Sequence, residues 1–107
     1  MKSGRVDDLK ALATEMSSRT EEHEPGAVTY EYNLNSEGTE CHIYERYADS
    51  SALMTHLGNF QEHFAGRFFD ILEIKRWTVY GNPSEEVRNT LGGMGATFFN
   101  PIAGFSR

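Results

Sequence analysis

The chain has 107 residues and a hydrophobic fraction of 38%, and its 10 Lys and Arg against 16 Asp and Glu give a formal net charge of -6. This length fits one domain with one modest hydrophobic core. The acidic balance disfavours nucleic-acid partners and anionic membrane surfaces, because affinity for phosphate groups needs a surplus of Lys and Arg on one face.

The number of cysteines and the hydropathy of the chain indicate the cellular compartment in which we expect the protein. Cys41 is the only cysteine, so the chain forms no internal disulfide and carries no CxxC redox or zinc motif. The first residues are not signal-like, and no apolar run approaches the ~18–20 residues that cross a bilayer. We therefore expect a cytoplasmic protein that binds no membrane.

The first predicted element is an amphipathic helix. Its apolar residues recur at spacings of three and four: Val6, Leu9, Leu12, Ala13 and Met16. Pro25-Gly26 ends it. The acidic run Glu21, Glu22 and Glu24 at its end is interpreted as a solvated face.

A hairpin of two strands is predicted next. Residues 28–34 alternate in a period of two, which places four apolar or aromatic side chains on one face: Val28, Tyr30, Tyr32 and Leu34. Gly38 suits a positive φ in the turn, and residues 41–47 form the second strand. One face of this strand carries Cys41, Ile43, Glu45 and Tyr47, and the other carries His42, Tyr44 and Arg46. Neither face is purely apolar.

The second half predicts a helix, a strand, a short helix and a tail. Asp49-Ser50 is a typical helix N-cap, and a break is expected at Gly58 or Gly66, since glycine costs about 1 kcal/mol relative to alanine. Residues 71–80 alternate as a strand, and a short helix follows from Asn82–Glu85 to Leu91. We expect residues 1–92 to form the main domain. Residues 93–107 are expected to be an apolar C-terminal extension that packs on its own or a partner subunit.

The predicted order is αββαβ followed by a short helix and a tail. A strand before the first helix would complete the ferredoxin-like, split βαβ arrangement, but only residues 1–5 are available for it. We therefore expect an α+β fold with an antiparallel sheet, helices on one face and a very short or absent first strand. The vacant sheet edge favours dimerisation.

Several segments carry a family resemblance. Residues 24–31 (EPGAVTYE), residues 41–50 (CHIYERYADS) and His56-Leu57 resemble the antibiotic biosynthesis monooxygenase family, over about residues 4–80. Residues 80–87 and 101–105 are similar to a subgroup with a C-terminal extension. The resemblance implies a dimeric α/β barrel of two ferredoxin-like subunits, each with a pocket between sheet and helices. Some members of this family oxidise polycyclic phenols or quinols with O₂ and no cofactor, and others degrade haem.

Cofactor-free oxidation of a phenol needs few groups. A base removes the phenolic proton, and polar groups in a dry aromatic pocket stabilise the resulting anion. His42 and Tyr44 share one face of the second strand, so we predict that His42 is the base and that Tyr44 acts beside it. The alternative is that both side chains make sheet-surface hydrogen bonds or lie under a dimer partner.

The residues predicted to bind substrate come from the hairpin, the second helix and the late strand: Tyr30, Tyr32, His56, Asn59, Phe60, His63 and Trp77. For His56 and Trp77 the alternative is a packing role in the core or at an interface. His63 is also a candidate haem ligand. No HxxxH or HxH spacing is present, so no metal site is predicted. The resemblance to a family with cofactor-free members implies that no cofactor is needed.

We therefore expect a homodimeric, cofactor-independent monooxygenase or oxidase, an antibiotic biosynthesis (quinol) monooxygenase, that acts on an aromatic phenol or quinol-like small molecule. The alternative is a non-catalytic module of the same fold that binds a small apolar ligand or acts in a stress response. Haem degradation is a third possibility.

Overall fold

The computed structural model describes all of residues 1–107 and forms an α+β fold of four helices and four strands. The elements in chain order are α1 (Val6–His23), β1 (Ala27–Leu34), β2 (Cys41–Tyr47), α2 (Ser50–His63), α3 (Ala65–Ile71), β3 (Thr78–Tyr80), α4 (Glu85–Gly93) and β4 (Thr97–Phe99). The predicted α+β class is confirmed. The chain folds into two compact units, Met1–Glu73 and Ile74–Arg107.

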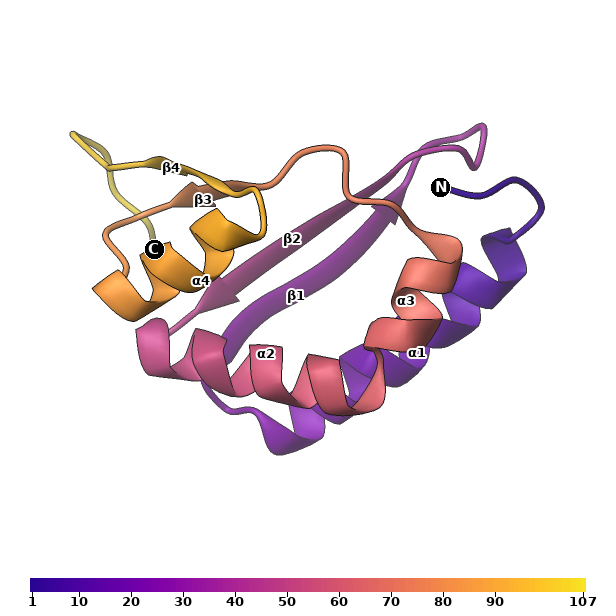
Figure 1. The fold of residues 1–107 in the computed structure, drawn as a ribbon, viewed down its shortest axis with the longest axis horizontal. Coiled ribbons are helices and arrows are strands. Elements are labelled where there is room, and N and C mark those ends of the chain that lie inside the picture. Colours follow the sequence, from indigo (N-terminus) through magenta and orange to yellow (C-terminus); the bar gives the residue numbers. More distant parts are fainter. The chain divides into compact units, whose positions relative to one another are not determined.

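The first unit is built around the antiparallel β1–β2 hairpin. Figure 1 shows the helices α1, α2 and α3 gathered along one side of it. Its core contains Leu9, Leu12, Met16, Phe64, Phe68, Ile71 and Leu72, with Tyr30, Tyr32, Leu34, Cys41, Ile43 and Phe60 packed against them. Three of the five apolar positions predicted for the first helix are therefore buried. Each buried leucine or methionine contributes about 1.5–3 kcal/mol through the hydrophobic effect.

Along the β1–β2 hairpin, successive side chains alternate between the two faces of the sheet except at one end. Tyr30 pairs with Glu45 and Tyr32 with Ile43, but the register shifts between Ala27 and Thr29. This irregularity adds a residue to one strand and turns its side chain away from the face it would otherwise share. Val28, predicted to lie with Tyr30 on the inward face, is consequently 60% exposed.

The caps and breaks of the first unit follow local chemistry. Asp49 Oδ1 accepts the Ala52 N–H at 2.8 Å, which confirms the predicted N-cap of α2. The helical stretch breaks at Phe64, near Gly66, whereas Gly58 lies inside α2. Gly38 has φ +69°, as predicted for the turn. Residues 1–5 form no strand, and the Lys2 N–H donates to the Ile71 carbonyl.

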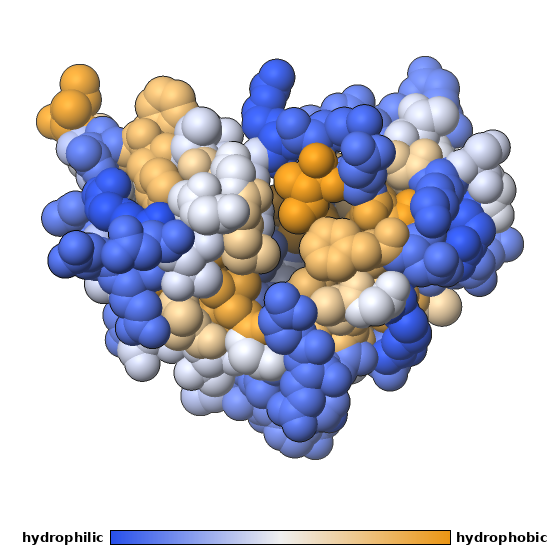
Figure 2. Space-filling view, viewed as in Figure 1, coloured by the Kyte–Doolittle hydropathy of each residue, from blue (hydrophilic) through white to orange (hydrophobic).

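The acidic end of α1 is only partly a solvated face. Glu21 and Glu22 are exposed, as predicted. Figure 2 shows hydrophilic groups along the lower edge of the molecule, where α1 ends. Glu24, which follows the helix, is instead buried. The interpretation of the whole acidic run as solvated is therefore wrong at its last member.

The second unit contains a parallel pair, β3–β4, and the helix α4. The strand predicted over residues 71–80 is shortened to Thr78–Tyr80, because Ile71 ends α3 and Leu72 packs into the core of the first unit. β4 lies within the predicted extension and pairs with β3. The first compact unit ends at Glu73, and the domain division predicted at residue 92 stays a prediction. Residues 101–107 are exposed.

The strands pair as two separate two-stranded sheets, β1–β2 and β3–β4. These pairings do not confirm the predicted ferredoxin-like sheet, which stays a prediction together with the dimer. No helix is long and apolar enough to cross a membrane.

Candidate functional site

A buried imidazole–carboxylate pair joins the turn before β1 to α2. His56 Nδ1 lies 3.0 Å from Glu24 Oε1, and the two side chains are 8% and 5% exposed. An ionised carboxylate can only accept hydrogen bonds, so Nδ1 carries a proton and donates it to Glu24. This leaves Nε2 as the nitrogen that is available for proton transfer.

A second carboxylate faces the other nitrogen of the same ring. His56 Nε2 lies 3.6 Å from Glu45 Oε1, which also accepts a hydrogen bond from the Tyr47 hydroxyl. Asn59 Nδ2 donates to Glu24 Oε2 at 3.2 Å. Because the Glu45 side chain is 34% exposed, this side of the ring lies nearer to solvent than the Glu24 side.

Aromatic rings surround His56. The ring centroids of Tyr30, Tyr47 and Phe60 lie 5.1, 5.5 and 6.4 Å from that of His56. Burial raises the pKa of Tyr30 to about 12 and also raises the pKa values of Tyr32 and Tyr47. All three phenols are therefore neutral at pH 7 and able to donate hydrogen bonds. We call Glu24, Tyr30, Glu45, Tyr47, His56 and Asn59 the His56 cluster.

Local sequence explains how these side chains converge. The Ala27 N–H donates to the Glu24 carbonyl at 3.0 Å, which closes the turn at Pro25-Gly26. A Cβ built on Gly26 would lie 2.5 Å from the Ala52 Cβ, so only glycine lets this turn approach α2 without displacing it. Period-two alternation puts Glu45 and Tyr47 on one face of β2, and helical spacing aligns His56 with Asn59.

The structure brings together five of the predicted site residues: Tyr30, Tyr32, His56, Asn59 and Phe60. His42 and Tyr44 lie on the opposite face of β2, and the His42 side chain is 79% exposed and 3.1 Å from Glu40. Their proposed catalytic roles stay predictions, but they do not join the cluster.

The remaining two predicted residues lie elsewhere. His63 is partly exposed, with Nε2 3.1 Å from an Arg19 guanidinium nitrogen. Trp77 belongs to the second unit and is half-buried. The predicted roles of both residues in substrate binding also stay predictions.

Sequence reasoning missed Glu24, Glu45 and Tyr47 as functional candidates. A signal for the last two was present, because they interrupt a strand face that begins with Cys41 and Ile43. Glu24 begins the EPGAVTYE segment that carries the family resemblance, but it also ends an acidic run and was therefore interpreted as part of a solvated face.

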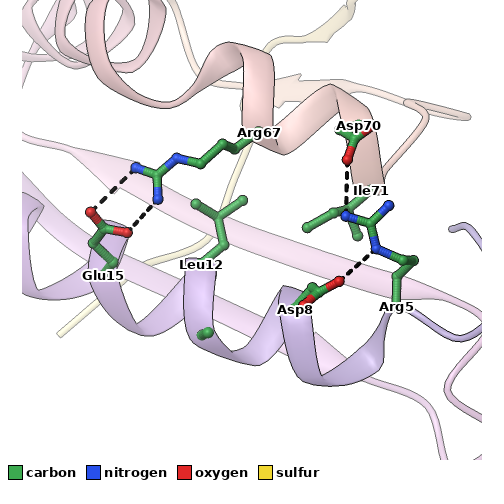
Figure 3. A pocket seen from close by; sticks show the side chains of 8 residues that line it. Arg5, Asp8, Leu12, Glu15, Arg67, Asp70 and Ile71 are labelled. Atoms are coloured by element: carbon green, nitrogen blue, oxygen red, sulfur yellow. Dashed lines mark hydrogen bonds and ion pairs between the residues drawn. The ribbon is translucent and has the colours of Figure 1, made fainter.

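A second polar region lies in a hollow of about 300 Å³ between α1 and α3. Arg67 donates to both oxygens of Glu15 at 2.7 and 3.2 Å, and Arg5 bridges Asp8 and Asp70 at 2.7 and 2.9 Å. Figure 3 shows these pairs on either side of Leu12 and Ile71. We call the five charged residues the α1–α3 clamp. Each of the five side chains forms an ion pair with another member of the clamp, so we assign to the clamp the structural role of holding α1 against α3.

No group of three His, Cys, Asp or Glu side chains is arranged to hold a metal ion. In the His56 cluster the carboxylates and the imidazole instead hydrogen-bond or face one another. This arrangement can accept a proton from a bound molecule and return it, in surroundings that are largely aromatic.

The chain is similar to a protein of known structure. No protein-family model matches the chain, and no curated protein is significantly similar to it. The crystal structure of MupZ from Pseudomonas fluorescens is similar, with a TM-score of 0.87 and 30% sequence identity. The match covers 100% of this chain and 87% of that chain. The resemblance to the antibiotic biosynthesis monooxygenase family is not tested by these findings and stays a prediction.

Proposed function

We propose, given that this chain belongs to the same family as MupZ from Pseudomonas fluorescens, that it is a cofactor-independent enzyme whose His56 cluster removes a proton from a small aromatic substrate. One observation carries the proposal. His56 is buried with its two ring nitrogens facing different carboxylates, at 3.0 and 3.6 Å. Buried titratable groups held by specific charged partners are common features of catalytic sites.

The roles of the residues follow from this geometry. Glu24 accepts the Nδ1 proton and thereby sets the tautomer in which Nε2 is the base, and Asn59 orients Glu24. Glu45 lies where it would stabilise the imidazolium that forms when Nε2 takes a proton. Glu24 and Asn59 are thus positioning residues, while His56 is the proposed catalytic base.

The proposed reaction is the oxidation of a phenol or quinol by O₂. His56 takes the phenolic proton, and the resulting anion gives electrons to O₂, which is the oxidant. In an oxidase reaction the quinol loses two protons and two electrons, and O₂ leaves as hydrogen peroxide. In a monooxygenase reaction the quinol supplies all four electrons that reduce O₂: one oxygen atom enters the ring, the other leaves as water with two hydrogens from the substrate, and the product is a hydroxyquinone. Neutral phenols such as Tyr30 and Tyr47 polarise the site without adding a negative charge.

Oxygen uptake with a panel of hydroquinones and polycyclic phenols tests the proposal, with His56→Gln and His42→Gln as matched variants. General-base catalysis contributes roughly 10²–10⁴-fold, so His56→Gln is expected to lose that factor while His42→Gln keeps wild-type uptake. Loss of uptake in His42→Gln alone would restore the assignment made from the strand pattern. No uptake above autoxidation across the panel contradicts the oxidation.

A second candidate is a non-catalytic module that retains a small apolar ligand. It is favoured by the observation that no buried side-chain nitrogen or oxygen lacks a hydrogen-bond partner, since a fully paired cluster also suits a structural role. Mass spectrometry of the molecule that co-purifies distinguishes the two, because a binding module returns its ligand unchanged after incubation in air.

We also propose that the protein is a homodimer with ferredoxin-like subunits. Val28 and Tyr44 are exposed on the β1–β2 hairpin, and apolar side chains of this kind favour a partner surface. Light scattering on the purified protein tests the dimer. A monomer at micromolar concentration contradicts it.

A further inference from the structure

The His56 cluster carries a net negative charge in either state of its imidazole. Glu24 and Glu45 supply two carboxylates, and the ion-pair contacts of both are made with His56, at 3.0 and 3.6 Å. When His56 is protonated, its positive charge offsets only one carboxylate, and when it is neutral it offsets neither. The other members of the cluster are neutral phenols and an amide. A bound molecule therefore meets a negative field in both states of the imidazole.

The two tyrosines beside His56 respond to this field. Burial is the main cause of the raised pKa values of Tyr30 and Tyr47, and the charges of Glu45 and Glu24 raise both values further. A phenol pKa raised in this way means that the surroundings disfavour a negative charge on the phenol oxygen. A carboxylate or a phosphate of a ligand is disfavoured at the same place for the same reason.

Of the two carboxylates, Glu45 is the one that a ligand can reach. Its side chain is 34% exposed, whereas that of Glu24 is 5% exposed. The contacts of Glu45 with His56 and with the Tyr47 hydroxyl both use Oε1. Because a carboxylate can accept about four hydrogen bonds, Oε2 is an acceptor for a donor group on a bound molecule. Arg46, the next residue along β2, belongs to the opposite face of the strand.

Aromatic rings lie next to this carboxylate. Tyr30 is paired with Glu45 across the hairpin, and the Tyr47 hydroxyl donates to Glu45. The centroids of the two tyrosine rings lie 5.1 and 5.5 Å from that of His56. The face of a tyrosine ring attracts an organic cation. The rings and the carboxylate thus favour the same kind of ligand.

We propose that Glu45 determines the specificity of this site by charge, so that the preferred ligand is an aromatic compound with a hydroxyl group and a protonated amine. The inference rests on the proposed function, in which the hydroxyl meets His56 Nε2. The ammonium group donates to Glu45 Oε2. Compounds with a carboxylate or a phosphate are rejected, because they bring a like charge against Glu45. The substrate class is thereby narrowed from phenols in general to phenols that carry an amine.

Three phenols of similar shape and different charge test this ranking. At pH 7, 3-(aminomethyl)phenol is a cation, 3-(hydroxymethyl)phenol is neutral and 3-hydroxybenzoate is an anion. Their binding is measured by NMR titration of the full chain in the absence of oxygen. A partly exposed ion pair contributes modestly and a nearby ring face adds to it, so we expect the amine to bind about tenfold more tightly than the alcohol. The benzoate is expected to bind more weakly than the alcohol.

The ranking can fail in three ways. Equal binding of the amine and the alcohol overturns the inference, as does tighter binding of the benzoate than of the alcohol. A chain that binds none of the three probes overturns it as well.

Glu45→Gln tests the assignment to this carboxylate. The substitution keeps the shape of the side chain and removes its charge, so it is expected to abolish most of the amine preference while the affinity for the alcohol is kept. Glu15→Gln in the α1–α3 clamp changes the net charge by the same amount and is expected to keep the wild-type ranking. An amine preference that survives Glu45→Gln, or that is lost equally in both variants, overturns the inference.

The dependence on salt provides a test that needs no variant. Salt screens the attraction between partly exposed charges, so the amine preference is expected to shrink as the salt concentration rises, while binding of the neutral alcohol stays nearly constant. An amine preference that is the same at low and high salt assigns the preference to packing instead of charge and overturns the inference.

The His56→Gln variant separates this inference from the proposed function. It is expected to keep the amine preference while losing oxygen uptake, because both carboxylates remain. A wild-type protein with an amine preference but no uptake contradicts the proposed oxidation and leaves the charge selectivity intact. Oxygen uptake with equal binding of the amine and the alcohol does the reverse.

Discussion

The His56 cluster and the α1–α3 clamp are both built from charged side chains that lie far apart in the sequence. Glu24 and His56 are 32 residues apart, while Glu15 and Arg67 are 52 apart. They differ in solvent exposure, because the first pair is at most 8% exposed and the second is more than half exposed. Burial makes each partner of the first pair depend on the other, whereas water can replace either partner of the second.

The His56 cluster and the α1–α3 clamp also differ in the chemistry that their side chains can perform. In the clamp, the guanidinium of Arg67 lowers the pKa of Glu15, and that of Arg5 lowers the pKa of Asp70, which keeps all these groups charged at neutral pH. A group held in one charge state is poorly suited to proton transfer. In the His56 cluster an imidazole, the side chain that most often serves as a general acid or base, faces two carboxylates. Proton transfer is therefore expected at the cluster and structural support at the clamp.

The largest expected effect comes from breaking the buried pair. Glu24→Ala leaves the His56 Nδ1 proton and the Asn59 amide without their acceptor, and each buried polar group left unpaired costs about 1–3 kcal/mol. Urea denaturation measures this loss in the free energy of unfolding. Arg67→Ala in the clamp is the control and is expected to change stability far less. Similar losses in the two variants would contradict the comparison.

A smaller loss of stability is expected from a change in the turn that positions Glu24. Gly26→Ala places a Cβ 2.5 Å from the Ala52 Cβ, and such overpacking typically costs about 1–3 kcal/mol. Ala52→Gly in the same chain removes the opposing atom and is expected to restore part of the stability. The double-mutant cycle measures this coupling. A coupling of zero means that the turn does not need this approach to α2.

The smallest effect is the acid response of the clamp. Their arginine partners lower the pKa values of Glu15 and Asp70 below the ordinary values of these carboxyl groups. Their contribution to stability is thus present at higher pH and lost as the pH falls through the lowered values. Glu15→Gln is expected to flatten the acid limb of stability measured against pH.

High salt provides the control for this acid response. Both clamp pairs are exposed, so salt screens them, and the difference between Glu15→Gln and the wild-type protein is expected to shrink as the salt concentration rises. A difference that persists in 1 M salt would assign the effect to packing between α1 and α3 instead of charge.

Much of the first unit could be read from local patterns. The spacing of Leu9, Leu12 and Met16 identified the buried side of α1, and Asp49 identified the start of α2. These signals work because helix periodicity and capping act within a few residues. The alternation over residues 71–80 predicted β3 but not its short length, and β4 carried no equivalent signal, since each of these strands has three residues and pairs with the other across a gap of more than fifteen residues.

The candidate site also combines features that the sequence predicts with features that only the tertiary structure decides. Period two in residues 41–47 determined that Glu45 and Tyr47 share one face and that His42 and Tyr44 share the other. Only the packing of β1 and β2 against α1 and α2 decided that the first of these faces is the inward one. Both faces mix polar and aromatic residues, so the alternation carried no preference between them.

By itself, then, the sequence determined the helices, the hairpin, the chain turn at Pro25-Gly26 and the sets of side chains that share a face, because these depend on interactions between near neighbours. Tertiary structure alone decided that Glu24 is buried against His56 and that the Tyr32 hydroxyl lies against Met16. Burial and these contacts depend on atoms contributed by α1 and α2, and a pattern within one segment contains no information about what another segment brings to it.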